Sequence, residues 1–185
     1  FWVVAASWGV IDRLGFSPLD YEPIIILLTV VHFHYAGYLL LQLYLLSLPH
    51  WNKKYGKVVG VLLLLGMPMV AVGISSTQIG WPGIIESLSV TVMASGGMGV
   101  GFGYLFLAWK FRGDVGALLW FVAGLCLIGG LTLAFLYGWR FQTELPWLSI
   151  PWMYAVHGTL NSVGFALFGL LGWRSSQINK SKASR

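Results

Sequence analysis

Long apolar stretches separated by short polar breaks dominate the pattern of this chain. Five stretches are long enough to cross a bilayer, which takes about 20 apolar residues. They cover residues 23–48, 57–77, 83–109, 116–138 and 151–173, after a shorter apolar stretch at 1–16. Pro, Gly and charged residues fill the breaks, which are short enough to make neighbouring helices antiparallel. The pattern predicts an all-α, polytopic transmembrane helix bundle of about six spans, the first short or truncated.

The composition agrees with a membrane protein and excludes an ordinary soluble enzyme. Hydrophobic residues make up 57% of the chain and charged residues only 9%, against about 25% charged in soluble domains. We expect one transmembrane domain at 1–175 and a polar, basic tail at 176–185. The chain starts at Phe1 inside an apolar stretch, so an N-terminal piece is expected to be missing. The net charge of +5 is interpreted as loop charge, and no nucleic-acid partner is expected.

The positive charges orient the bundle. All Lys and Arg residues except Arg13 and Arg140 fall in the loops at 48–57 and 109–116 or from Arg174 onward. Cytoplasmic loops carry an excess of Lys and Arg. The tail and both basic loops are therefore predicted to be cytoplasmic, in a multi-pass protein of the cell membrane, with the bacterial plasma membrane as the expected location.

A glycine-rich run lies within the stretch at 83–109. Gly97 with Gly101, and Gly99 with Gly103, form pairs of small residues four positions apart. Such pairs let two helix backbones approach closely in a membrane. We predict that Gly99 or Gly101 touches the backbone of another helix.

Several polar side chains lie where hydrocarbon is expected. Ionisable residues inside spans are costly and usually mark a function or a specific internal partner. From a rise of about 1.5 Å per residue, His32 lies roughly 13 Å beyond Pro23, and His157 and Asn161 roughly 9 and 15 Å beyond Pro151. Glu86 lies roughly 6 Å beyond Pro82. All of these groups fall in the outer half or at the centre of the bilayer, which indicates a single site.

Helix geometry restricts how such a site is built. His32 and His34 lie on different faces of a regular helix, His32 with Tyr35 and His34 with Tyr38 and Gln42. His157 and Asn161 share a face because they are four residues apart. We predict that His157 and Asn161 face one cavity with His32, or with His34 in its place. Tyr35 is expected to help orient a ligand there, and Glu86 to line the outer mouth.

Some of these residues also resemble a known family. The string His32-Phe33-His34-Tyr35-Ala36-Gly37 is the most specific part of the resemblance. Further matches are Leu14-Gly15-Phe16, His157-Gly158, Asn161 and Gly164-Phe165. Together they resemble the YndJ-like family of bacterial integral membrane proteins over most of the chain. The resemblance implies a polytopic bacterial membrane protein, often longer at its N-terminus, and brings no mechanism.

Three kinds of function fit the polar residues. In the first, His32, His157 and Glu86 supply acid and base, with Asn161 and Tyr35 orienting a lipid or isoprenoid-like substrate. In the second, His32 or His34 binds haem iron together with His157, or His32, His157 and Glu86 bind zinc. In the third, the chain is a transporter or a subunit of a larger membrane complex. Membrane lipids are expected partners in all three, and the residues identify no cofactor.

Overall fold

The computed structural model describes the backbone of residues 1–183 and the side chains of residues 1–176. This part of the chain is helical and contains no β-strand. Five helical segments are long and apolar enough to span a membrane: Pro23–His50, Lys53–Gln78, Ile84–Lys110, Val115–Gly138 and Ile150–Ser176. A shorter helix, α1 (Trp2–Arg13), precedes them. The predicted bundle and its spans are therefore confirmed.

Three of the spans are single regular α-helices, and the other two are composite. The regular spans are α4 (Lys53–Gln78), α5 (Ile84–Lys110) and α6 (Val115–Gly138). The first composite span runs through α2 (Pro23–His32), the π-helical segment η2 (Phe33–Leu39), α3 (Leu40–Ser47) and the 3₁₀ turn η3 (Leu48–His50). The second runs through α7 (Ile150–Trp152), the π-helical segments η4 (Met153–His157) and η5 (Leu160–Leu167), and α8 (Phe168–Ala183).

Local sequence signals fix where the helices begin. The side chain of Asn52 accepts hydrogen bonds from the backbone N–H groups of Lys54 and Tyr55, and Asp114 caps α6 at Gly116 in the same way. Such caps satisfy N–H groups that have no partner inside the helix. Pro23 opens α2, as proline at the first helical position commonly does. The expected tail at 176–185 begins inside α8. Its side chains beyond Ser176, and residues 184 and 185, lie outside the described part.

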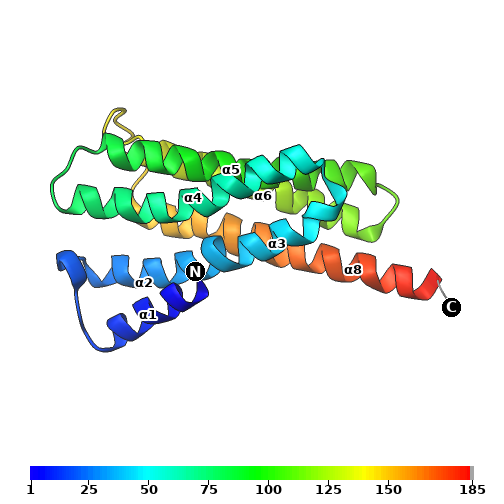
Figure 1. Ribbon diagram of the computed structural model, residues 1–185, viewed down its shortest axis with the longest axis horizontal. Helices are drawn as coiled ribbons and strands as arrows, with labels where there is room; N and C mark the ends of the chain where they lie inside the picture. The colour runs from blue at the N-terminus through cyan, green and yellow to red at the C-terminus, as the bar shows by residue number, and fades with distance from the viewer. Residues whose placement is uncertain (184–185) are drawn as a thin grey trace.

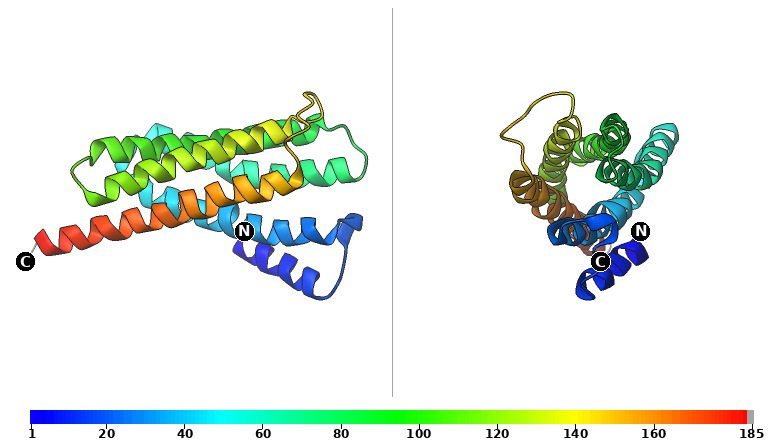
Figure 2. Two further views of the ribbon diagram at one scale, coloured as in Figure 1. Left: turned by 180° about the vertical axis from the view of Figure 1, so that it is seen from behind. Right: turned by 90° about the vertical axis from the view of Figure 1, so that its left-hand side faces the viewer.

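The spans pack side by side as an elongated bundle (Figure 1). In sequence order, α5 packs between α4 and α6, and α6 then packs against η4, η5 and α8. The first span joins this group through contacts of η2 with η5 and of α3 with α5. The short helix α1 lies at the margin, against α2 and η2 (Figure 2). The first and last spans, which carry His32 and His157, are therefore neighbours.

One tyrosine connects three of the spans in the core. Tyr104 on α5 is fully buried. Its hydroxyl donates a hydrogen bond to the carbonyl of Leu43 on α3, 3.3 Å away. It also accepts one from the indole N–H of Trp173 on α8, 2.9 Å away. A buried hydroxyl without partners is costly, so these bonds favour this one arrangement of the three helices.

Glycines bring α5 against both of its neighbours. A Cβ atom added at Gly101 would lie 3.1 Å from the carbonyl oxygen of Gly124 on α6, and one added at Gly66 would lie 2.7 Å from Cα of Met93. Backbone therefore meets backbone at Gly101, which confirms the predicted close packing. Gly99 meets the side chain of Val59 instead, and its carbonyl accepts a hydrogen bond from the Tyr55 hydroxyl.

The orientation of the bundle gives a direct prediction. With Cys126 replaced by serine, a cysteine at Glu144 should react with a membrane-impermeant maleimide applied to intact cells. A cysteine at Gly113 should react only after the membrane is permeabilised. Both positions are exposed in loops at opposite ends of the bundle. The opposite labelling pattern would reverse the predicted orientation.

Candidate functional site

His157 and Asn161 form a polar cluster against α6. The Nδ1 atom of His157 lies 2.7 Å from the carbonyl oxygen of Gly130. The side-chain amide of Asn161 donates to the carbonyl of His157 at 2.8 Å and lies 3.2 Å from the imidazole nitrogens. A Cβ atom added at Gly130 would lie 2.9 Å from the Asn161 amide nitrogen. Glycine at position 130 therefore gives the cluster its space.

These contacts determine which nitrogen of His157 carries the proton. The carbonyl of Gly130 can only accept a hydrogen bond, so Nδ1 of the neutral imidazole is the protonated nitrogen. Its Nε2 atom then keeps a lone pair. The side-chain oxygen of Asn161 is buried and has no hydrogen-bond partner in the described part of the chain. The Asn161 oxygen is thus an acceptor that is available to a ligand, whereas the Nε2 atom of His157 lies 3.2 Å from the Asn161 amide nitrogen.

His32 lies on the first span, which packs against the last span through η2 and η5. Its Nε2 atom is buried and makes no hydrogen bond with any described residue. Buried polar atoms nearly always have partners, so an unpaired one calls for an explanation. His32 and the pair formed by His157 and Asn161 therefore lie on two neighbouring spans.

The helices are distorted where these residues lie. Within residues 1–183, the π-helical segments occur only in the two composite spans, as η2, η4 and η5. The segment η2 begins directly after His32, η4 ends at His157, and η5 includes Asn161. Segments of π-helix are rare and are frequent at functional sites. Their position is a second, independent feature of the same region.

Glu86 has a different partner. Its carboxylate accepts hydrogen bonds from the guanidinium of Arg140, at 2.6 and 3.3 Å. The guanidinium also donates to the carbonyl of Tyr137 and lies over the rings of Tyr137 and Phe141. This bidentate pair joins the start of α5 to the end of α6. In the structure Glu86 therefore serves a contact between helices, and the predicted position at the mouth of a histidine site remains a prediction.

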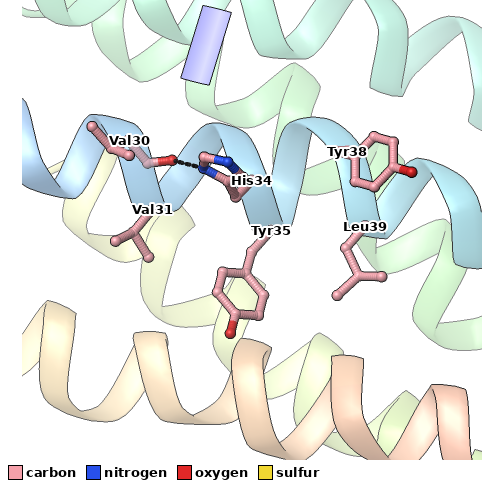
Figure 3. Close-up of a pocket in the computed structure, with 6 residues that line it drawn as sticks. All are labelled: Val30, Val31, His34, Tyr35, Tyr38 and Leu39. Atoms are coloured by element: carbon pink, nitrogen blue, oxygen red, sulfur yellow. Dashed lines mark hydrogen bonds between the residues drawn. The ribbon is translucent and has the colours of Figure 1, made fainter. Parts of the chain in front are cut away.

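Tyr35 and His34 lie on a groove that His32 does not line. The groove has a volume of about 470 Å³ and is lined by Val30, Val31, His34, Tyr35, Tyr38 and Leu39, all from one stretch of helix (Figure 3). The Nδ1 atom of His34 lies 2.8 Å from the carbonyl oxygen of Val30, one turn earlier. A regular helix would place Tyr35 on the face of His32.

The described residues contain no group of three or more His, Cys, Asp or Glu side chains placed to hold a metal ion. The zinc hypothesis required His32, His157 and Glu86 to meet, and both oxygens of Glu86 are bonded to Arg140 instead. Sequence reasoning missed Arg140 as a partner and Gly130 as a carbonyl acceptor. One feature of the sequence could have drawn attention to Arg140: it is one of only two basic residues on the predicted outer side.

Apolar spans in a helical bundle, with polar side chains in their interior, define a multi-pass α-helical membrane protein. A family model described as YndJ-like protein matches residues 1–165. The chain therefore belongs to the YndJ-like family, as its histidine string indicated.

One curated relative is the uncharacterized membrane protein YndJ of Bacillus subtilis (strain 168). It is 28% identical to this chain over 168 residues, which is 84% of this chain and 28% of that protein. The chain thus spans little more than a quarter of the length of this relative. No solved structure matches this chain.

Proposed function

We propose that His32, His157 and Asn161 form a membrane-embedded site that binds the polar end of a lipid or isoprenoid-like molecule and performs acid/base chemistry on it. The observation that carries the proposal is the buried, unpaired Nε2 atom of His32, on a span that packs against the one with His157 and Asn161. An unsatisfied polar group inside a membrane costs several kcal/mol. A bound polar group that pairs with it removes this cost.

In this proposal each residue has a role that its hydrogen bonds support. Because Nδ1 of His157 donates to Gly130, its Nε2 atom is the base that accepts a proton from a substrate hydroxyl or an acidic C–H group. The resulting His157 imidazolium returns a proton to the product, and His32, from the other span, hydrogen-bonds to the polar end of the substrate through its Nε2 atom. The free oxygen of Asn161 accepts a hydrogen bond from the substrate and orients it. The protons balance because the His157 imidazole gains one proton and gives one back.

The surroundings favour an amphipathic substrate. The site belongs to two spans at membrane depth, and the exposed faces of the neighbouring regular spans are apolar, with side chains such as Leu64, Val72, Leu118 and Leu125. A molecule that reaches the histidines through the bilayer needs a hydrophobic body and a small polar end. Lipid alcohols and isoprenoid compounds have this composition.

The test measures what the protein carries. The full-length protein is purified in mild detergent, its bound lipids are extracted, and they are quantified by mass spectrometry. We expect an acyl or prenyl compound to copurify with the wild type and to fall at least about ten-fold in His32→Phe, equivalent to about 1.4 kcal/mol of binding. His34→Gln is the matched control, because His34 lies only two residues away and bonds to Val30 instead. Equal retention in the two variants would contradict the proposal.

The same preparation tests the haem alternative. A pair of histidines from two helices is an axial ligand set that haem proteins use, and His32 with His157 has the right composition. A visible absorption band that copurifies with the wild type and disappears in His32→Phe would replace the lipid proposal with a haem site. A colourless protein that retains a prenyl or acyl compound supports the proposed function.

A further inference from the structure

The hydrogen bonds of Asn161 determine which of its two amide atoms is left for a ligand. The amide nitrogen donates to the backbone carbonyl of His157, 2.8 Å away. A carbonyl only accepts, so the nitrogen and not the oxygen must lie on that side. The oxygen is buried and has no hydrogen-bond partner in the described part of the chain. An amide oxygen also only accepts, so any group that pairs with it must be a hydrogen-bond donor.

The packing of Asn161 favours this orientation of its amide. The amide lies directly against Gly130 of α6, where an added Cβ atom would lie 2.9 Å from the nitrogen and 3.0 Å from the oxygen. Turning the amide over would bring its oxygen against the carbonyl oxygen of His157. The neighbouring Ser162 differs, because its hydroxyl donates to the carbonyl of Gly158 in its own helix. Of these two polar side chains, only Asn161 leaves a buried atom unpaired.

The elements that carry the groups of the proposed site contain almost no charge. These elements are the first span, α6 and the last span. None of the three contains Asp or Glu, and Arg174 is their one Lys or Arg residue. It lies roughly 20 Å beyond Asn161 along the helix, at 1.5 Å per residue. Arg140, just past the end of α6, is already bonded to Glu86. The described part of these elements therefore offers no charge to neutralise an ionic group at Asn161.

A charged polar end is unfavourable in such surroundings. Charges inside a membrane protein pair with an opposite charge or face a water-filled cavity. A phosphate or diphosphate would meet the acceptor oxygen of Asn161 and no cation, and an ammonium group would meet no carboxylate. A neutral group avoids both costs. The polar end of the ligand must therefore be a donor and must be uncharged.

We infer that the ligand of this site is a long-chain alcohol whose uncharged hydroxyl donates a hydrogen bond to the side-chain oxygen of Asn161. Resting on the proposed function, this assignment names the substrate class of the same site. A hydroxyl combines a donor and an acceptor on one atom, so it suits both Asn161 and the unpaired Nε2 atom of His32. Esters, ethers and aldehydes of the same chain have no donor and would leave the Asn161 oxygen unpaired.

Binding of matched probes tests the assignment. The full-length protein is reconstituted in nanodiscs, and radiolabelled farnesol is displaced with unlabelled farnesol, farnesyl phosphate or farnesylamine, with empty nanodiscs as the background. We expect the alcohol to bind at least about ten-fold more tightly than the phosphate or the amine, as for one buried polar group left without its partner. 1-Hexadecanol and its phosphate repeat the comparison on an alkyl chain. A phosphate or amine that binds as tightly as the alcohol overturns the assignment.

One substitution tests the Asn161 oxygen itself. Asn161→Leu keeps a similar volume and removes the acceptor, so we expect it to weaken binding of farnesol about ten-fold. Farnesyl methyl ether, which has no donor, should bind equally to this variant and to the wild type, whereas a general structural defect would weaken both ligands. Ser162→Ala is the matched control and should bind farnesol like the wild type. Undiminished binding of farnesol by Asn161→Leu contradicts the assignment.

The remaining outcomes separate this assignment from the proposed function. Tight binding of farnesyl phosphate that is lost in His32→Phe would overturn the alcohol and keep the histidine site. Failure of every probe to bind would also overturn the alcohol, while a different lipid that copurifies with the wild type and not with His32→Phe would support the site. Equal binding of farnesol by His32→Phe and the wild type would overturn both.

Discussion

Replacing Arg140 with methionine is expected to lower the free energy of unfolding by about 3 kcal/mol or more. The substitution leaves the Glu86 carboxylate without its partner, and removing one member of a buried ion pair strands the other charge. The Glu86 side chain is only 5% exposed, and both of its oxygens bond to the guanidinium. The thermal midpoint in detergent measures the loss.

The reverse substitution should cost less. Glu86→Gln leaves the arginine alone, but the Arg140 side chain is 27% exposed and keeps its bond to Tyr137. It can therefore reach water, and a loss of about 1–2 kcal/mol is expected. The double variant should be more stable than Arg140→Met alone, because it contains no unpaired charge. An equal loss in both single variants, or a larger loss in Glu86→Gln, would show that the pair does not stabilise the bundle in this way.

The spans were predictable because hydropathy depends only on local composition. All five predicted segments agree with the observed spans to within about one helical turn. The largest difference is at the start of α4, which begins at Lys53, four residues before the predicted segment at 57. The Asn52 side chain caps the helix there. A prediction from hydropathy alone leaves the charged first turn of α4 out of the span. Charged residues nevertheless extend a helix readily once its N-terminus is capped.

The faces of the helices were less predictable than their lengths. The prediction that Tyr35 shares a face with His32 assumed a regular helix. Tyr35 lines a groove with His34, and His32 is not among the residues that line it. Asn161 and His157 contact each other, as expected for residues four apart. The π-helical segment η2 begins directly after His32, and no periodicity in the sequence marks where a helix widens.

Pairings between distant residues could not be obtained from one sequence. Glu86 and Arg140 are 54 positions apart, and each is the kind of residue that a buried site or an interfacial loop contains. Depth along the helices predicted that Glu86 lies near the outer surface, and in the structure Glu86 lies in the first turn of α5. Its partner depends on how α5 and α6 pack. The glycines determine that packing.

Replacing Gly124 with alanine is expected to lower the free energy of unfolding by about 1–3 kcal/mol, the typical cost of overpacking. The added Cβ atom would lie 2.8 Å from the carbonyl oxygen of Gly101, and backbone cannot move aside as a flexible side chain can. The contact between α5 and α6 therefore has to open. The loss should exceed the gain of about 1 kcal/mol that alanine brings to a helix in place of glycine.

Gly129→Ala provides the matched control because it makes the same chemical change on the same helix. Its added Cβ atom would lie 3.7 Å from its nearest neighbour, a methyl group of Leu160, which is an ordinary contact. Helix propensity should then dominate, leaving the thermal midpoint unchanged or higher. We therefore expect Gly124→Ala to lower the thermal midpoint and Gly129→Ala not to lower it. If both variants raised it, the close approach of α5 and α6 at Gly101 and Gly124 would be wrong, and so would the packing that places Arg140 beside Glu86.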